Sequence, residues 1–446
     1  METNIPEIWA YDYILAFLYI LIIYVISHAY TINKKRTDST YKHFMLALTV
    51  KLFGGIGFLL LSVYYWKGGD TFTYYNTADG LTSLFLEDFI VAFKILFTSS
   101  DNIIWERYSF ADWHHNFLSD NASFTVIKIT SIINLLCFRS YVATTVIYSS
   151  LSFLGVWNMY YVFCKKYPHL KKSLVLAFFF IPSVILWGSG ILKDTITIAA
   201  IGWLIYAFMN IVIFKRKRML SLVLIIIATM SIALLKPYIL YVLYPCLFIW
   251  VQSNLKSLIT SNLLRYLTAP VVAITLIASS FFLSKKLSEN AGKYNINKIE
   301  ATLEGFQSWH TLVNETKNQS GYTLGDMDFS TTGLILKIPA SINVTFFRPY
   351  LWEVRNASTL LGAFEAIVLT LYSLWLVLKF RLKLFRLIFR NKDILFLLIF
   401  ALIFGVVVGI SSYNFGALSR YKMPAQMFYV IALILIYDKQ AKKELV

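Results

Sequence analysis

The run ILFLLIFALIFGVVVGI, residues 394–410, has no charged or hydrogen-bonding side chain. An α-helix rises about 1.5 Å per residue, so about 20 apolar residues cross the hydrocarbon core of a bilayer. Comparable apolar runs recur along the chain, beginning with residues 13–30. The sequence therefore predicts an all-α, polytopic integral membrane protein.

The composition of the 446-residue chain supports this interpretation, with 58% hydrophobic and 15% charged residues. Soluble domains carry about 25% charged residues. The net charge of +17 is concentrated in short connections between apolar runs. These basic connections are residues 34–42, 165–172, 215–218 and 379–392. The positive-inside rule explains them as cytoplasmic loops near membrane lipids, so we expect no nucleic-acid partner.

Placing the basic connections in the cytoplasm gives about eleven or twelve hydrophobic helices in a single transmembrane domain, residues 1–446. Two long outer loops interrupt these helices, at residues 67–122 and 284–340. In the first loop, residues 81–97 carry apolar side chains at helical spacing, which predicts an amphipathic helix in the outer interface. Residues 124–137 are shorter than a full crossing requires, so we interpret them as a half-span.

A tight outer turn is the strongest candidate for a binding site. Residues 182–194 read PSVILWGSGILKD, with a proline, two glycines and the adjacent charges of Lys193 and Asp194. Ionisable groups at membrane depth are costly and usually mark a site. A helix that begins here would offer free N–H groups and a lysine to a phosphate. The alternative is that Lys193 and Asp194 neutralise each other or cap the helix; we favour the binding site.

The segment GGDTFTYY, residues 68–75, opens the first outer loop. Asp70 would be held near the interface, where its carboxylate could act as a general base towards a hydroxyl group. Tyr74 would support the acceptor beside it. The alternative is that Asp70 caps a helix that starts at Thr71, which the sequence by itself slightly favours.

The last outer turn, residues 414–424, reads NFGALSRYKMP. Arg420 offers a planar fork for phosphate oxygens, and Lys422 adds a point charge. Both residues could instead anchor the final span. Since the positive-inside rule requires no cations on the outer side, anion binding is favoured. Asn414 opens this motif and is a candidate support residue.

Three further groups at the outer ends of spans are weaker candidates. Arg348 and Glu353 flank Pro349, Tyr350 and Trp352, a combination that suits an anion site but also an aromatic belt with a snorkelling arginine. Lys236 precedes Pro237 as another cation at an outer helix end. No histidine or cysteine spacing indicates a metal site, and no nucleotide motif is present, so we expect neither metal nor cofactor.

Three of these segments together resemble bacterial polytopic proteins of cell-surface polysaccharide assembly. These are the Gly-Asp-Thr opening of the first loop, the turn that ends in Lys193–Asp194, and the late Asn-x-Gly…Arg-Tyr-Lys-x-Pro motif. The family includes O-antigen-polymerase-like and exopolysaccharide-polymerase-like proteins, within the wider class of glycosyltransferases that use polyprenyl-linked sugars.

The resemblance implies an architecture like that of the GT-C glycosyltransferases in a bacterial inner membrane. A polyprenyl-linked sugar donor and a glycan acceptor would meet at the periplasmic face. By analogy Asp70 would activate the acceptor, supported by Tyr74, Glu353 and Asn414. The implied contacts of the lipid phosphate are Lys193, Asp194, Lys236, Arg348, Arg420 and Lys422. We expect these residues to converge on one pocket.

Two other functions stay open. A transporter or flippase for a lipid-linked or anionic solute would have charges lining a path through the bilayer, and Lys51, inside the second apolar run, favours it. A non-catalytic membrane scaffold would use its outer loops to bind partners.

Overall fold

The computed structural model describes residues 5–108, 115–255, 303–305, 307–308 and 320–444. Within these ranges the structure is helical and contains no β-strand, apart from one isolated bridge between Gly321 and Asn414. The prediction of an all-α protein with apolar, membrane-length helices is confirmed.

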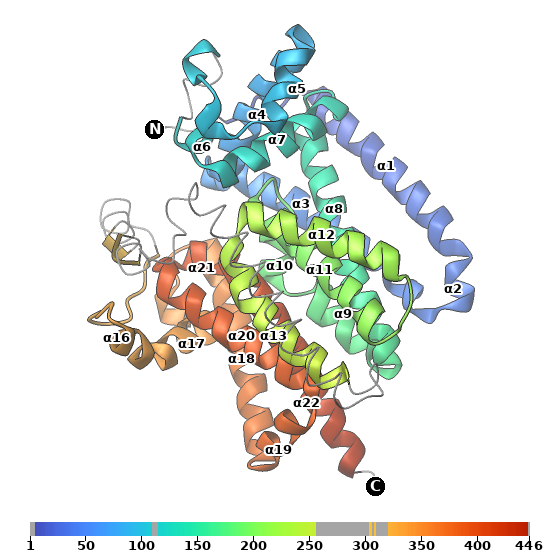
Figure 1. The fold of residues 1–446 in the computed structure, drawn as a ribbon, viewed down its shortest axis with the longest axis vertical. Coiled ribbons are helices and arrows are strands. Elements are labelled where there is room, and N and C mark those ends of the chain that lie inside the picture. Colours follow the sequence, from blue (N-terminus) through green and yellow to red (C-terminus); the bar gives the residue numbers. More distant parts are fainter. Residues whose placement is uncertain (1–4, 109–114, 256–302, 306, 309–319, 445–446) are drawn as a thin grey trace. The chain divides into compact units, whose positions relative to one another are not determined.

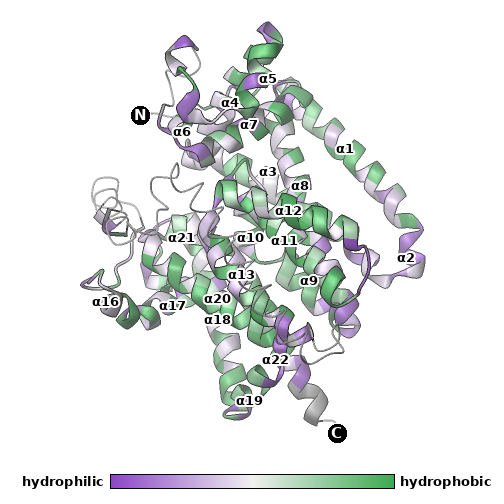
Figure 2. Ribbon diagram, viewed as in Figure 1, coloured by the Kyte–Doolittle hydropathy of each residue, from purple (hydrophilic) through white to green (hydrophobic). Residues whose placement is uncertain are grey.

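Six helical segments of the described residues are long and apolar enough to cross a membrane. They are Ala10–Ile32 (α1), Ser39–Trp66 (η1, α3 and η2), Lys193–Val212 (α11), Arg218–Leu235 (α12), Ala357–Phe380 (α18) and Lys392–Ser412 (α20). The expected count of eleven or twelve included runs that form shorter helices, such as the nine-residue α9 (Lys171–Phe179). Another predicted span, residues 267–283, lies outside the described residues. Figure 2 shows that α1 is hydrophobic along most of its length.

The chain divides into two compact units. The first unit comprises Met1–Lys165, Ile185–Ala207 and Leu222–Lys236, and the second comprises Lys166–Val184, Phe208–Ser221 and Pro237–Val446. Besides the segments above, the first unit contains α2 (Lys34–Thr37), α4 (Asp70–Glu87), α5 (Phe89–Phe97), α6 (His115–Ser119), α7 (Asn121–Leu136) and nearly all of α8 (Tyr141–Lys166). The second contains α9, α13 (Pro237–Leu255), α16 (Thr331–Leu336), α17 (Ile338–Phe347), α19 (Lys383–Arg390), α21 (Phe415–Tyr421) and α22 (Met423–Glu444), while α10 (Pro182–Trp187) continues from the second unit into the first (Figure 1).

Glycines let the backbones of α8 and α11 touch in the first unit. A Cβ atom built on Gly155 would lie 2.3 Å from the carbonyl oxygen of Ala199, and one on Gly202 would lie 2.2 Å from that of Gly155. Ser149 and Ser152 of α8 each donate a 2.7 Å hydrogen bond to the turn before α11, at the carbonyls of Ser189 and Gly188. This packing fixes where α11 begins.

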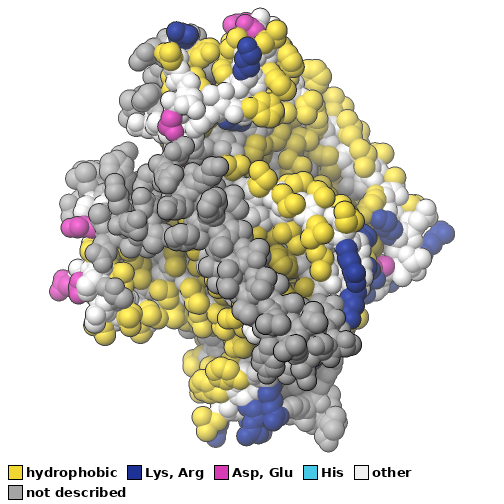
Figure 3. Space-filling model, in the orientation of Figure 1, with side chains coloured by type: hydrophobic (Ala, Val, Ile, Leu, Met, Phe, Trp, Pro, Cys, Tyr) yellow, Lys and Arg dark blue, Asp and Glu magenta, His cyan; other side chains and the backbone are white. Residues whose placement is uncertain are grey.

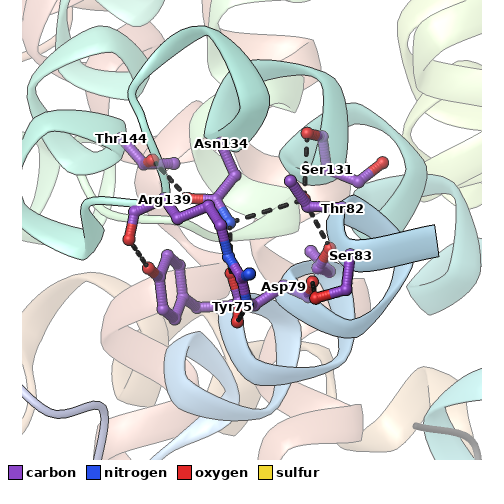
Figure 4. A network of polar contacts seen from close by, with 9 residues as sticks. Tyr75, Asp79, Thr82, Ser83, Ser131, Asn134, Arg139 and Thr144 are labelled. Carbon is purple, nitrogen blue, oxygen red and sulfur yellow. Dashed lines mark hydrogen bonds and ion pairs between the residues drawn. The ribbon is translucent and has the colours of Figure 1, made fainter. Parts of the chain in front are cut away.

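A polar network holds α4, α7 and α8 together (Figure 4). The axes of α7 and α8 differ by 114°, as in a broken span or a re-entrant loop. Arg139, in the left-handed region at φ 61°, lies in the bend between these two helices. Its guanidinium donates to both carboxylate oxygens of Asp79 on α4, at 2.8 and 2.5 Å. The sharp bend after the 16-residue α7 agrees with the half-span expected at residues 124–137.

Most of the first part of the predicted first outer loop is helix. The amphipathic helix expected at residues 81–97 is two helices, since Asp88 ends α4 and caps α5 through a 3.1 Å hydrogen bond from the Val91 N–H. The polar α4 is buried against α7 because its threonines satisfy their own hydroxyl groups. Thr77 and Thr82 donate to backbone carbonyls one turn earlier, at 2.7 and 2.8 Å.

In the second unit the apolar run of residues 394–410 lies in the core helix α20, which packs against α13, α17 and α22. Phe400 and Phe404 stack within the core, with ring centroids 5.4 Å apart. At the start of α20, the buried Asp393 accepts hydrogen bonds from Lys166 and from the indole of Trp250, both at 2.7 Å. A charge inside this core is thus tolerated because other groups of the same unit satisfy it.

Candidate functional site

The predicted outer turn ends in Lys193 and Asp194, which pair with Asp120 and Lys236 of other segments; we call these four residues the α11 cluster. The Lys193 ammonium lies 2.7 Å from Asp120, the residue that caps α7. The Lys236 ammonium, at the end of α12, lies 2.6 Å from Asp194. Each charge of the Lys193–Asp194 dipeptide thus has a partner on another segment. The adjacent pair predicted from sequence becomes two cross-linking ion pairs.

The two ion pairs of the α11 cluster differ in burial. The side chains of Lys236 and Asp194 are 6% and 3% exposed, while those of Lys193 and Asp120 are 12% and 27% exposed. Removing one partner of a buried pair leaves an uncompensated charge at a cost of about 3–5 kcal/mol. Solvent screening makes the other pair weaker. The Asp194–Lys236 pair is therefore the buried part of the cluster, and the Asp120–Lys193 pair is the part more accessible to solvent.

The turn before α11 lies beside the segment that leads to Asp70. Trp187 stacks on Trp66, with ring centroids 5.1 Å apart and planes 9° from parallel. Asp70 follows Trp66 by four residues. Because a chain spans at most about 3.5 Å per residue, the Cα atom of Asp70 lies within about 14 Å of that of Trp66. The proposed base and the turn that leads to Lys193 thus belong to one region of the first unit.

Asp70 is the first residue of α4, and its side chain is half-buried. The residue at the N-cap position is Gly69, at φ 120°, a conformation that favours glycine. The helix start expected at Asp70 is confirmed, but Gly69 and not Asp70 occupies the cap position; a carboxylate in the first turn is still favourable to the helix dipole. Tyr74 is buried on the same helix, edge-on to Phe117 at 5.3 Å between ring centroids.

The other predicted site residues lie in the second unit. The Arg348 side chain donates from Nε to both carboxylate oxygens of Glu353, each at 3.1 Å. The guanidinium carbon is 5.9 Å from the Tyr322 ring centroid and 5.6 Å from that of Phe415. Burial tends to raise the pKa of Glu353, but the hydrogen bonds from Arg348 and the Tyr350 N–H outweigh it and lower that pKa. This pair organises the chain around Pro349.

In the last outer turn, the candidate residues have different surroundings. Asn414 caps α21, where its side-chain oxygen accepts from the Gly416 N–H at 2.8 Å. Lys422 is fully buried, 3.6 Å from the Glu365 carboxylate. Arg420 is half-buried, with its guanidinium carbon 5.8 Å from the Tyr421 ring centroid. Of the two cations, Arg420 is the one with surface left for a ligand.

Sequence reasoning missed two carboxylates that the structure makes prominent. Asp120 is half of the more exposed pair in the α11 cluster. Glu365 is buried in α18 and accepts from the Ser183 N–H at 2.9 Å, the Ser183 hydroxyl at 3.2 Å and the Gln426 amide. The signal for Glu365 was available, because a carboxylate inside an apolar run of spanning length is a site candidate by default. Asp120 had no such signal.

The predicted residues therefore form two groups, one in each unit. Asp70, Tyr74, Lys193, Asp194 and Lys236 belong to the first unit, and Arg348, Glu353, Asn414, Arg420 and Lys422 to the second. Convergence of the two groups on one pocket stays a prediction. Among the described residues, no three His, Cys, Asp or Glu side chains gather as metal ligands would. Comparison of the chain with protein-family models, curated proteins and solved structures finds no match.

Proposed function

We propose that this chain is a membrane glycosyltransferase or polysaccharide polymerase of cell-surface polysaccharide assembly. It would take sugar from a polyprenyl phosphate or pyrophosphate at the periplasmic face of a bacterial inner membrane. The observation that carries the proposal is the α11 cluster, which gathers two lysines at the start of a candidate membrane span. Lysines at that position suit a phosphate attached to a lipid. The charged phosphate of such a lipid needs water while its hydrocarbon chain stays in the bilayer, so the phosphate lies at the end of a membrane span.

In the proposed reaction a hydroxyl oxygen of the acceptor attacks the anomeric carbon of the donor sugar. The bond from that carbon to the phosphate oxygen breaks, and the phosphate leaves with the bonding electrons. Asp70 takes the hydroxyl proton as general base. Positive charge next to the leaving phosphate stabilises the developing negative charge.

The difference in burial assigns roles to the two lysines. Lys193 is the phosphate ligand, because its partner Asp120 is the most exposed member of the cluster and can release it. Lys236 is a positioning residue, because its ion pair fixes the buried Asp194. Asp194 follows Lys193 directly in the sequence, so fixing Asp194 also fixes the backbone at Lys193. In the second unit, Arg420 is a better candidate for an anion ligand than Lys422, since Lys422 is buried next to Glu365.

The test is transfer of a radiolabelled sugar from a polyprenyl-linked donor by the purified chain in detergent or vesicles. Asp70→Asn and Lys193→Gln should each lower the rate by at least about 100-fold, the usual contribution of a general base or of one charge-stabilising donor. Lys94→Gln is the matched control, because Lys94 is an exposed lysine on α5 in the same unit. Wild-type rates in both Asp70→Asn and Lys193→Gln would remove the assignment.

A transporter or flippase for a lipid-linked or anionic solute is the second candidate. It is favoured by Lys51 and Glu365, which are 3% and 6% exposed inside candidate membrane spans. Charges at that depth are typical of a transport path. Vesicles that contain the chain and a fluorescent lipid-linked sugar separate the two functions. A transporter would move the intact lipid between leaflets without an acceptor, and Glu365→Gln would slow it.

A further inference from the structure

The short helix α19 has a surface that neither proposed function uses. It follows α18 after a turn at Arg381 and packs against α18, α20 and α22 of the same unit. From residue 379 to residue 392 the chain has six cations and no acidic residue. The cations are Lys379, Arg381, Lys383, Arg386, Arg390 and Lys392.

The side chains on α19 sort into three sectors around the helix axis. Leu387 is buried and faces the rest of the unit. Lys383, Arg386 and Arg390 are exposed, and their i, i+3, i+7 spacing places them along one side. The same spacing aligns three exposed apolar side chains, Leu382, Phe385 and Phe389, which are 84%, 61% and 71% exposed. The basic and apolar sectors are adjacent, because each residue turns the helix by about 100°.

Figure 3 shows the result on the surface, where dark blue cations lie directly beside yellow hydrophobic side chains over α19. An eight-residue helix is too short to cross a bilayer. Its exposed apolar sector is therefore not explained by a membrane crossing. It needs an apolar environment that lies next to negative charge, because the basic sector is adjacent.

Aromatic residues at the end of α18 mark the level of this helix relative to a bilayer. Trp375 lies 5.6 Å from Tyr437 of α22, measured between ring centroids, and both are partly exposed. The Lys379 ammonium lies 4.9 Å from the Trp375 ring centroid and 5.3 Å from that of Tyr437. Tryptophan and tyrosine with a snorkelling lysine are typical of the boundary between acyl chains and headgroups. The chain reaches α19 only a few residues later, so α19 lies at this boundary.

We propose that α19 is an interfacial helix that binds the headgroups of anionic phospholipids, with its apolar sector inserted among the upper acyl chains. Charge complementarity selects the headgroup, since each cation near an anionic surface strengthens binding about fivefold. The apolar sector distinguishes a lipid from a free phosphate, because a free phosphate offers no hydrocarbon to Leu382, Phe385 and Phe389. The inference does not depend on which reaction or transport the chain performs.

The experiment uses the full chain in phosphatidylcholine nanodiscs with a rising fraction of phosphatidylglycerol. Thermal unfolding gives the fraction at which the anionic lipid has half its stabilising effect. In the variant Lys383→Gln/Arg386→Gln/Arg390→Gln this midpoint should rise about fivefold per cation removed or pass out of range. High salt should weaken the effect for the wild type. An unchanged midpoint in the triple variant would overturn the proposal.

Three controls keep the outcome specific. Lys383→Arg/Arg386→Lys/Arg390→Lys retains the charge and should keep the wild-type midpoint; a loss in this variant would contradict recognition by charge. Soluble glycerol phosphate should give no stabilisation, and an effect equal to that of the lipid would make the surface a site for free anions. The unfolding temperature in pure phosphatidylcholine verifies that each variant is folded.

A label at Leu382→Cys tests the insertion directly. The described native cysteines are buried, so an environment-sensitive dye attaches to the new, exposed position. Bromine atoms near the top of the acyl chains should quench the dye. Quenching by aqueous iodide instead would place the apolar sector in water and refute the interfacial geometry.

Discussion

The α11 cluster of the first unit and the Glu365 network of the second unit both bury a lysine beside a carboxylate, but with different geometry. Lys236 meets Asp194 at 2.6 Å, in direct contact. Lys422 is 3.6 Å from Glu365, whose carboxylate also accepts from Ser183 and Gln426. In the first case the ion pair itself compensates the buried charges. In the second case, the neutral donors Ser183 and Gln426 compensate part of the charge of Glu365. Removing the lysine and removing the carboxylate should therefore change stability by different amounts.

The largest expected effect is at the direct pair. Lys236→Met would leave Asp194 buried without its cation, so the free energy of unfolding should fall by about 3–5 kcal/mol. Lys193→Gln is the matched control in the same cluster, and at its more exposed position the loss should be about 1 kcal/mol or less. Denaturation of both purified variants in detergent measures the difference. Equal losses would show that burial does not separate the two pairs.

At the indirect pair, the expected effect should depend on which partner is removed. Lys422→Met leaves Glu365 with its bonds from Ser183 and Gln426, so the free energy of unfolding should fall by about 1–2 kcal/mol. Glu365→Ala strands the fully buried Lys422 and should cost about 3–5 kcal/mol. The same denaturation assay ranks the two variants. If Lys422→Met lowered the free energy of unfolding more than Glu365→Ala, the proposed difference between the direct and the indirect ion pair would be wrong.

The smallest effect concerns Glu353, a partly buried acid that pairs with Arg348. Its pKa is lowered in the folded chain, so its contribution to stability is present above the unfolded-state pKa of about 4.3. That contribution is lost as the pH falls from there through the lower folded-state pKa. Wild-type stability should therefore decline in this acid range by a few tenths of a kcal/mol more than that of Glu353→Gln, measured by thermal unfolding against pH. Parallel pH profiles would contradict this role.

The helices also differ in how far the sequence predicts them. Apolar runs predicted α11, α12, α18 and α20 because hydrophobicity over about 20 residues is a local property. The same reasoning did not predict that α4 is buried, because its threonines and charged residues mark a polar stretch. Its burial depends on α7, which packs against it from more than 30 residues away in the chain. The composition of a short segment cannot predict a contact with a segment that is distant in the chain.

For the candidate site, the sequence identified Lys193, Asp194 and Lys236 as unusual charges but did not predict their partners. An adjacent lysine and aspartate on a helix point in different directions, so each is free to find a partner elsewhere. Asp120 was overlooked because an aspartate at a helix start needs no special explanation. Its second contact, with Lys193, becomes visible only when α7 and α11 are folded together.

By itself, the sequence determined that this chain is an all-helical protein with several membrane-length apolar segments, and where its cations accumulate. Helix formation and burial in a bilayer follow from side chains close together in the chain. Only the tertiary structure decided which charges meet, which pairs are buried, and that the apolar side chains beside the basic sector of α19 stay exposed. These properties depend on contacts between distant segments, and a difference of 1 Å in one such contact changes what an ion pair contributes.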